Sequence, residues 1–540
     1  MNESSDARAD VTPQSHREDP NELLNPETDP GGIEFGAFGT ETDADLNWFS
    51  MVRSKAQTKA TSSSRYPWWV LGALLAGLLA LNITFTVFIV ALPKVANEFH
   101  TSITVLTWTM TGPLLAYGLA APILGKTGDI FGHRRLYLFG LAGAMVSAVL
   151  TAMAPNVVLL LGARTLDGIQ GAATGTASMA LIMNAFAPED RVKAMGWWTL
   201  VGAGGPVIGV SLGSPIIQFF GWRALFWMQL VLLILAFAVV AIILPSDRGT
   251  PDELAKQRAV AKKEFRTMDW IGSMSLSIGV TAIMLGLSIA PLKGWTSTWS
   301  VLSWVVGAVS LALFVYRIRS STNPLIPPRY FKMRNFMMPM VIRGTSNFAY
   351  FGAFFLFPLL MEEGYRYSVG QVGAVAIARP LAFALCSPAA GYLAVKIGER
   401  TSAIAGTIAL TVSMIIFASL VIGSSVILVI LALALSGIGM GVAMPSTSAT
   451  MANVVDAKEM GVMSAAQMLA MQVGEVAGIQ VLITIQQNVA RRKGLLGSNQ
   501  TAQLLATFHL PFLVGALVCV IGVVCAFFIQ AMPRGAKAKN

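Results

Sequence analysis

The sequence predicts an all-α polytopic membrane protein with about fourteen transmembrane helices. Three observations carry this prediction. Of the 540 residues, 54% are hydrophobic and only 12% are charged, which is too little charge to cover a water-soluble protein of this size. Long apolar runs recur along the chain, each close to the ~20 residues that a helix needs to cross the hydrocarbon core. Basic residues gather at the ends of these runs, where membrane topology requires them.

The chain begins with a segment of different character. Residues 1–66 are polar, acidic and rich in proline, so we expect a disordered cytoplasmic tail there. The first apolar run begins too late for a secretory signal peptide, and it is therefore expected to remain as the first span.

Apolar runs separated by polar or turn-forming loops define the remaining elements in chain order. The expected spans are 68–92, 104–124, 136–154, 157–184, 195–219, 224–245, 270–291, 298–317, 337–361, 371–392, 402–423, 426–448, 462–486 and 506–531. An even number of spans places both termini on the same side of the membrane.

The distribution of basic residues decides which side that is. Arg53, Lys55, Lys59 and Arg65 lie shortly before the first span, and the later loops on the same side include "KQRAVAKKEFR" and "RYFKMRN". The other side carries isolated residues such as Lys94 and Arg223, with "ARRKG" (490–494) as the exception. The positive-inside rule therefore predicts a multi-pass protein of the cell (plasma or inner) membrane with both termini in the cytoplasm. Since the net charge of +10 is explained by topology, we expect no nucleic-acid partner.

The loop between the second and third spans reads "GKTGDIFGHRR". Gly125 and Gly132 permit a tight turn and a close approach of helices. Asp129 can sit at a helix start, where the helix dipole favours an anion, and Arg134 and Arg135 can pair with it from the cytoplasmic side. An ordinary charged turn is the alternative interpretation.

The second half of the chain repeats this pattern. "GYLAVKIGER" (391–400) keeps both glycines and the arginine at the same spacing, with Val395 in the place of the aspartate. Two related helical halves with loops at equivalent positions are what a rocking transporter uses.

These loops make the sequence similar to the Major Facilitator Superfamily, and in particular to its fourteen-span drug:proton antiporter branch. "RTLDGIQGAA" (164–173) resembles the signature of the fourth span, and "GAGGPVIGV" (202–210) resembles the antiporter signature of the fifth. "GWRALFWMQ" resembles the opening of the sixth span, while "MDWIGSMSLSIGVTAIMLGLS" and "NPLIPPRYFKMRNF" resemble the two extra spans and the loop after them. The resemblance covers roughly residues 68–532.

The resemblance implies a major-facilitator-type fold in which two six-helix bundles are related by pseudo-symmetry. The implied domains are an N-terminal bundle at 67–246, a cytoplasmic loop with two extra spans at 247–336, a C-terminal bundle at 337–532 and a short cytoplasmic tail at 533–540. The "GKTGDIFGHRR" segment then becomes a gating loop.

The antiporter signature supplies a stripe of small residues. Gly202, Gly205 and Gly209 lie three or four residues apart, and Pro206 removes a backbone hydrogen bond among them. Such a face lets two helices touch and slide, although ordinary membrane-helix packing explains it equally well.

Two departures from the branch concern its proton chemistry. The branch commonly carries an acidic residue about three turns before "ALP" in the first span, whereas this chain has Thr84 there and Asn82 as the nearest polar neighbour. In the fourth span the signature has a glutamine three residues after the arginine, and this chain has Asp167.

The charges within the fourth span are therefore candidates for proton coupling or for the substrate cavity. Arg164 lies eight residues beyond Asn156, roughly 12 Å along a helix, and Asp167 follows on nearly the same face. A lone charge at that depth costs at least ~2.5–3.5 kcal/mol, so both must face the interior, a water-filled cavity or each other. Two interpretations stay open: a static ion pair, or an Asp167 that has taken over the protonation lost from the first span.

A second set of buried charges lies in the C-terminal half. Glu475 is in mid-span, with Gly474 and Gly478 offering a close-packing surface beside it. Arg379 in the tenth span is the expected ion-pair partner of Glu475, while a coupling role or a lipid-facing position for Glu475 are the alternatives. Arg343 lies a turn or two inside the ninth span and is expected to snorkel to the cytoplasmic surface.

The ninth span also reads "NFAYFGAFFLFPLLMEE", whose aromatic side chains are suited to binding hydrophobic or cationic molecules or to contacting lipid. No nucleotide-binding loop, nucleophile–base set or metal-ligand spacing occurs in the sequence, so we expect neither an enzyme nor a cofactor or metal. The predicted function is a secondary active efflux transporter. It would export hydrophobic or cationic small molecules across the lipid bilayer by alternating access, in exchange for protons. Two alternatives remain: an exporter of lipid-like metabolites without conventional proton coupling, and a non-transporting membrane scaffold or sensor.

Overall fold

The computed structural model describes residues 65–101, 103–106, 108–244, 251–321, 323–421, 423–494 and 501–530. The expected N-terminal tail, apart from its last two residues, and the C-terminal tail at 533–540 lie outside them. The described residues form helices joined by short loops, without a β-strand among them. The all-α prediction is thus confirmed for this part of the chain.

The helices follow the expected spans in order. They are α2 (Tyr66–Glu98), α3 (Ile103–Leu106), α4 (Trp108–Phe131), α5 (His133–Ala152), α6 (Val157–Ala185), α7 (Arg191–Phe220), α8 (Arg223–Ile243), α9 (Pro251–Thr267), α10 (Trp270–Lys293), α11 (Thr298–Ser320), α12 (Pro328–Lys332), α13 (Arg334–Leu359), α14 (Val369–Ala376), α15 (Ala378–Ile397), α16 (Glu399–Ala418), α17 (Val426–Ala452), α18 (Met460–Arg492), α19 (Thr501–Leu505) and α20 (His509–Phe527). The described residues also form a short π-helix (Leu360–Gly364) and a 3₁₀ turn (Ala457–Glu459). Within the described residues, 11 helical segments are long and apolar enough to cross a membrane.

The expected span 371–392 is divided into α14 and α15 by a turn at Ile377. Pro380 accounts for the division, because a proline has no N–H for the preceding turn and its ring crowds the carbonyl of Ala376. The break places Arg379 in the first turn of α15.

Polar side chains cap the first turns of α6 and α10. Asn156 accepts the N–H of Leu159 at 2.9 Å and begins α6, and Asp269 accepts the N–H of Gly272 at 3.0 Å and begins α10. Such caps satisfy N–H groups that a first helical turn leaves without partners.

The helices pack as two sets. In the first half α2 lies against α7 and α8, and α6 lies against α4 and α5; in the second half α13 lies against α18 and α20, and α17 lies against α15 and α16. We call these sets the N-terminal bundle (α2 and α4–α8) and the C-terminal bundle (α13–α18 and α20). Helices α10 and α11 pair with each other, and α10 contacts both α4 and α18. The exact domain boundaries remain predictions.

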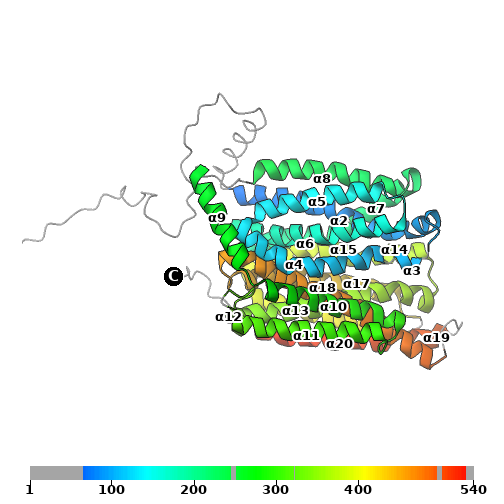
Figure 1. Ribbon diagram of the computed structural model, residues 1–540. Coiled ribbons are helices and arrows are strands. Elements are labelled where there is room, and N and C mark those ends of the chain that lie inside the picture. Colours follow the sequence, from blue (N-terminus) through cyan, green and yellow to red (C-terminus); the bar gives the residue numbers. More distant parts are fainter. Residues whose placement is uncertain are drawn as a thin grey trace, which may run out of the picture. The chain divides into compact units, whose positions relative to one another are not determined.

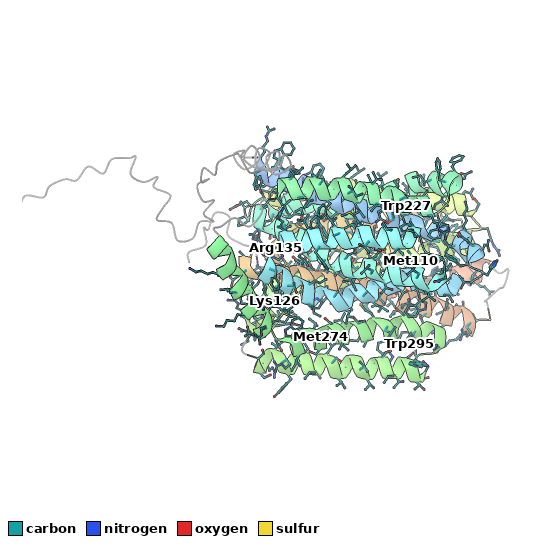
Figure 2. All side chains as sticks on the ribbon, turned by 45° about the horizontal axis from the view of Figure 1, so that its top comes forward. Met110, Lys126, Arg135, Trp227, Met274 and Trp295 are labelled. Atoms are coloured by element: carbon teal, nitrogen blue, oxygen red, sulfur yellow. The ribbon has the colours of Figure 1, made fainter. Side chains whose placement is uncertain are left out.

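Figure 1 shows the helices running side by side, with α9 and α12 at one end, here called the α9 end, and α3, α14 and α19 at the other. The basic residues Lys126 and Arg135 lie toward the α9 end and Trp295 toward the opposite end (Figure 2).

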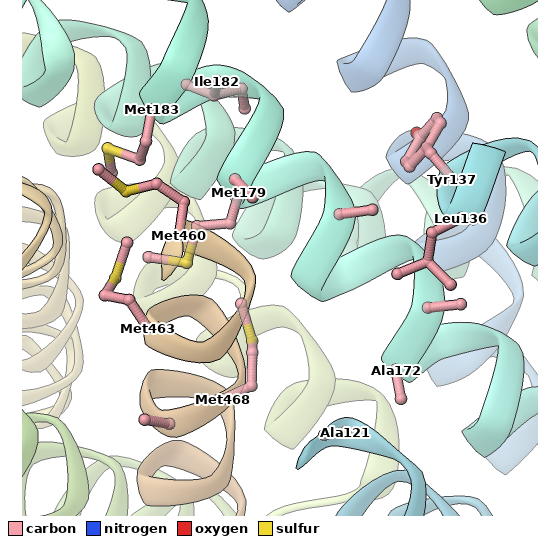
Figure 3. Packing of buried hydrophobic residues seen from close by; sticks show 14 of the residues in the cluster. Ala121, Leu136, Tyr137, Ala172, Met179, Ile182, Met183, Met460, Met463 and Met468 are labelled. Atoms are coloured by element: carbon pink, nitrogen blue, oxygen red, sulfur yellow. The ribbon is translucent and has the colours of Figure 1, made fainter. Parts of the chain in front are cut away.

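The two bundles meet along α7 with α15 and α17, and along α4 and α6 with α18. Methionines fill part of this interface: Met179 and Met183 of α6 lie opposite Met460 and Met463 of α18 (Figure 3). Flexible thioether side chains fill irregular gaps between packed helices.

Candidate functional site

The first candidate element is the loop between α4 and α5. Gly132 has φ 95°, a left-handed conformation that favours glycine, and Gly398 in the second copy of the loop has the same φ of 95°. Gly125 lies against the backbone carbonyl of Gly461, where a side chain on Gly125 would collide with it. The predicted tight turn and close helix approach are therefore confirmed.

Asp129 has different partners from those expected. It lies near the end of α4, and its carboxylate accepts the N–H of Gly461 at 2.7 Å and the N–H of Val462 at 3.1 Å. His133 lies 3.2 Å from the same carboxylate. Asp129 thus sits at a helix start, as predicted, but the helix is α18 of the other bundle. The sequence could not place α18 beside this loop, since more than 300 residues separate them.

Among the described residues no ion pair joins Asp129 to Arg134 or to Arg135, so the expected pairing is wrong. Arg134 donates from Nε to the carbonyl of Leu244 at 3.0 Å and from Nη2 to that of Ala241 at 3.2 Å. It therefore binds the C-terminal carbonyls of α8, where the helix dipole favours a cation.

The second copy of the loop keeps the close packing but loses the cap. Gly391 lies against the backbone of Val192 in α7, and Val395 packs beside Val192 and Ala394 in an apolar cluster. The side chain of Val395 has no acceptor for the N–H groups at the start of α7, so of the two loops, as far as the structure describes them, the N-terminal one alone carries a cap across the interface.

A polar contact that the sequence did not predict joins α7 to the end of α17. Arg191 donates from Nη1 to the carbonyl of Ala452 and to Oδ1 of Asn453, both at 3.0 Å. Glu399, within the second copy of the loop, accepts from Thr450 at 2.7 Å and from Asn453 at 3.3 Å. The glutamate in that copy, where the first loop has His133, was the one signal in the sequence.

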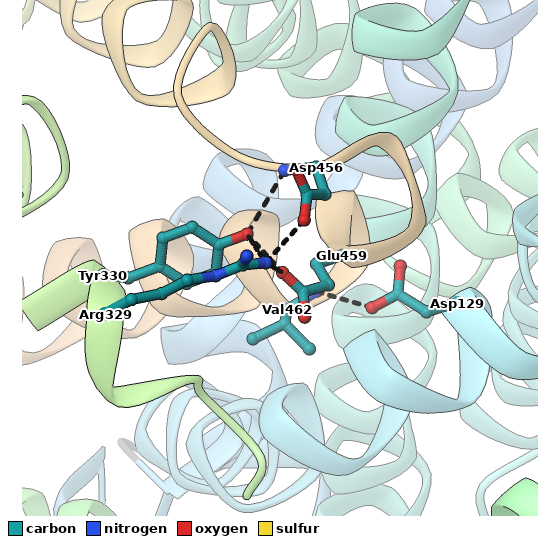
Figure 4. Close-up of polar contacts among 6 residues, drawn as sticks. All are labelled: Asp129, Arg329, Tyr330, Asp456, Glu459 and Val462. Atoms are coloured by element: carbon teal, nitrogen blue, oxygen red, sulfur yellow. Dashed lines mark hydrogen bonds and ion pairs between the residues drawn. The ribbon is translucent and has the colours of Figure 1, made fainter. Parts of the chain in front are cut away.

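A second missed contact, which we call the linker latch, joins α12 to the turn before α18. Arg329 pairs with Asp456 at 2.5 Å and with Glu459 at 3.0 Å, and the hydroxyl of Tyr330 donates to Glu459 and accepts the N–H of Asp456 at 3.2 Å. Figure 4 shows these contacts beside the Asp129 cap. Burial, the hydrogen bond to Glu459 and the negative charges of both carboxylates raise the pKa of Tyr330 to about 12.

Within the N-terminal bundle, Arg164 and Asp167 of α6 pair with each other. Arg164 is buried, and its guanidinium carbon lies 5.7 Å from the ring centroid of Phe226 in α8. The Oγ of Ser147 in α5 lies 2.5 Å from Asp167 Oδ1 and 2.8 Å from the carbonyl of Ala163. Nothing in the sequence singled out Ser147.

The remaining residues of the first and fifth spans are near one another. Gly205 of α7 lies against Asn82 of α2, while a side chain on Gly202 would meet open space. Asn82 donates to the carbonyl of Leu78 at 2.8 Å, and Thr84 is buried. Pro206 and Gly209 lie within α7, but their surroundings lie outside the described part of the chain.

The charges of the C-terminal bundle do not pair as expected. Arg379 and Glu475 are both buried, yet no ion pair joins them, so the predicted Arg379–Glu475 pair is wrong, as is a lipid-facing Glu475. Arg343 is 2% exposed and donates to Ser448 at 3.0 Å, so it does not snorkel to the surface. The predicted close packing of Gly474 and Gly478 is confirmed, against the backbones of Gly344 and Phe348 in α13.

Comparison with known sequences matches this architecture. A sequence profile of the Major Facilitator Superfamily matches residues 73–342 and 339–540. The multidrug resistance protein Stp of Mycobacterium tuberculosis (strain CDC 1551 / Oshkosh) is 27% identical over 397 residues, which cover 73% of this chain and 71% of Stp. The tetracenomycin C resistance and export protein of Streptomyces glaucescens is 25% identical over 427 residues, covering 79% of this chain and 77% of that protein.

One further relative and one solved structure are also similar to this chain. The multidrug resistance protein B homolog of Mycobacterium tuberculosis (strain ATCC 25618 / H37Rv) is 28% identical over 422 residues, covering 77% of this chain and 76% of the homolog. The crystal structure of the human organic anion transporter MFSD10 (TETRAN) has a TM-score of 0.60 at 16% identity, covering 84% of this chain and 99% of MFSD10. At this level of identity, the similarity to MFSD10 concerns the fold alone.

Proposed function

Because the chain belongs to the Major Facilitator Superfamily, we propose that it exports hydrophobic small molecules, such as drugs and toxic metabolites, by alternating access in exchange for protons. The chain is a multi-pass membrane protein of a transporter family and not an enzyme. The relatives named for multidrug resistance and for export support drugs as its cargo.

The observation that carries the alternating-access proposal is the cap that Asp129 forms on α18. The cap, the linker latch and the Arg191 contacts all lie between or beside the two bundles at the α9 end. On the predicted topology this is the cytoplasmic end, and on this proposal the contacts hold the transporter closed toward the cytoplasm. Hydrogen bonds and ion pairs of this kind break and re-form as a unit when bundles rock.

The surroundings of Asp167 support proton exchange. Ser147 has one hydroxyl proton but two acceptors within reach, Asp167 at 2.5 Å and the carbonyl of Ala163 at 2.8 Å. An ionised Asp167 accepts from Ser147 and from Arg164. A protonated Asp167 donates to Ser147, which then donates to Ala163. The site therefore holds Asp167 in either protonation state, as a proton carrier requires.

The experiment is export of the neutral fluorescent probe 1-pyrenemethanol from proteoliposomes with an imposed pH gradient. The wild-type chain is expected to respond to the gradient, and Asp167→Asn is expected to lose that response. Asp190→Asn is the matched control, since Asp190 is a surface residue paired with Lys193 at 2.6 Å. Ser147→Ala leaves the Arg164–Asp167 pair intact and should shift the pH dependence of export. An Asp167→Asn chain that responds to the gradient as the wild type does would exclude proton coupling at this residue.

Thr84 favours a second candidate function, because it is buried at the position where the antiporter branch has its acidic residue. That function is export of lipid-like metabolites without conventional proton coupling. Wild-type export that ignores the pH gradient would favour it.

A further inference from the structure

Arg379 is a buried cation with free hydrogen-bond donors. Its side chain is 1% exposed, and its Nε donates to Ser436 Oγ of α17 at 2.8 Å. Its guanidinium carbon lies 4.2 Å from the ring centroid of Tyr350 in α13. Both terminal nitrogens, Nη1 and Nη2, are buried without a hydrogen-bond partner. These two nitrogens form the end of the guanidinium fork that binds two oxygens of a carboxylate, sulfonate or phosphate.

A second buried arginine lies on the same face of α13 as Tyr350. Arg343 precedes Tyr350 by seven residues, or about two helical turns. It donates from Nη1 to Ser448 at 3.0 Å, and its Nε has no partner. Ser448 belongs to α17, which also contacts α7 of the N-terminal bundle. The face of α13 that carries Arg343 is thus directed at α17, a helix of the interface between the bundles.

Neither arginine has a counter-ion within the described part of the chain. The acidic residue buried in the same bundle, Glu475, pairs with neither Arg343 nor Arg379. A buried cation without an anion is strongly unfavourable in a membrane-embedded bundle. The bundle therefore carries an excess of positive charge that a bound anion would compensate.

Arg379 lies beside the kink that Pro380 introduces between α14 and α15. Helix α15 also packs against α7 of the N-terminal bundle, so rocking of the bundles would uncover this region.

We infer that Arg379, with Tyr350 beside it and Arg343 further along α13, binds the anionic group of an amphipathic cargo. The cargo class is a hydrophobic molecule that carries a carboxylate, sulfonate or phosphate, and the expectation of a cationic cargo is replaced by that of an anion. This inference rests on the proposed export function and specifies its substrate.

The test uses three probes with the same pyrene ring and different charge: 1-pyrenesulfonate, 1-pyrenemethanol and 1-pyrenemethylammonium. Binding to the full-length purified chain in nanodiscs is measured by pyrene fluorescence. We expect the sulfonate to bind at least about tenfold more tightly than the ammonium probe. Arg379→Gln should remove about tenfold of the sulfonate affinity and leave the affinity for pyrenemethanol within about twofold. Arg379→Lys, which keeps the charge but not the fork, should fall between the two.

Arg400→Gln is the matched control, because Arg400 is exposed and donates to the carbonyl of Phe527 at 2.8 Å. Tighter binding of the ammonium probe, or equal sulfonate affinity in wild-type and Arg379→Gln chains, overturns the inference. The wild-type comparison of sulfonate with ammonium decides the matter even if the variant fails to fold. Absence of pyrenemethanol export from proteoliposomes counts against the proposed function instead, and the binding measurement still decides the inference.

Discussion

The carboxylate of Asp129 accepts the backbone N–H of Gly461 at 2.7 Å, so a residue of the N-terminal bundle caps a helix of the C-terminal bundle. The N–H of Val462 at 3.1 Å completes the cap. These donors belong to the first turn of α18 and have no partner within their own helix. Separating the bundles at the α9 end must break both hydrogen bonds, and this contact therefore favours the closed state.

Asp129→Asn should shift the equilibrium toward opening of the α9 end. The variant loses the negative charge and one acceptor oxygen, which we expect to cost about 1–3 kcal/mol of the closed state. Ala465, 2% exposed and packed against Gly125, becomes a reporter when it is replaced by cysteine in a chain whose three native cysteines are alanine. A membrane-impermeant maleimide applied from the α9 side should label this cysteine faster in Asp129→Asn. Equal labelling rates in Asp129→Asn and in the surface control Asp190→Asn would show that the cap does not hold the gate.

Val395→Asp should have the opposite effect. Val395 occupies the place of Asp129 in the repeated loop and packs beside Val192 in the first turn of α7. An aspartate there could accept the free N–H groups of that turn and create the missing second cap. We expect slower labelling of the Ala465→Cys reporter and slower export. Val395→Asn separates the effect of charge from that of size, and faster labelling in Val395→Asp would mean that the lost apolar packing outweighs the cap.

Gly478→Ala should destabilise the C-terminal bundle. A methyl group on Gly478 would overlap the carbonyl of Phe348 in α13, and overpacking of this kind typically costs about 1–3 kcal/mol. Gly162→Ala in α6 is the matched control, because nothing lies within 4 Å of its added carbon. Thermal unfolding of the purified variants should show a lower midpoint for Gly478→Ala alone. Equal midpoints would mean that α13 and α18 can move apart at little cost.

Tyr330 should make the linker latch sensitive to alkaline pH. Burial and the two neighbouring carboxylates raise the pKa of Tyr330 to about 12, above the ordinary value of 10.0. The protonated hydroxyl therefore stabilises the folded chain below about pH 10, and this contribution is lost as the pH rises toward 12. The unfolding midpoint of the wild type should exceed that of Tyr330→Phe at pH 8, and the difference should shrink toward pH 11. A difference that stays constant over this range would contradict the assignment.

Much of the fold could be predicted from the sequence, because the signals for it are local. Hydrophobic length and polar loops predict transmembrane helices, and the fourteen expected ranges fall on helices of the structure, although 104–124 covers α3 and α4 and 371–392 covers α14 and α15. The tight turn between α4 and α5 could also be predicted, since Gly132 and its counterpart Gly398 share one left-handed backbone conformation. The Arg164–Asp167 pair could also be predicted from a local signal, because residues three apart on a helix lie near each other.

Contacts between side chains of helices far apart in the sequence depend on helix packing, which no local sequence pattern encodes. Asp129 meets Gly461, Ser147 meets Asp167, and Arg379 lies on Tyr350 instead of pairing with Glu475. Charge alone suggested that Arg379 and Glu475 should meet, because each would be costly without a partner. Helix position and rotation decide which side chains come within hydrogen-bonding distance, and these depend on the fit of entire helix surfaces. For that reason the sequence predicts that Arg379 and Glu475 lie in the interior, while the three-dimensional arrangement determines which charges have a partner and buries Arg343 as well.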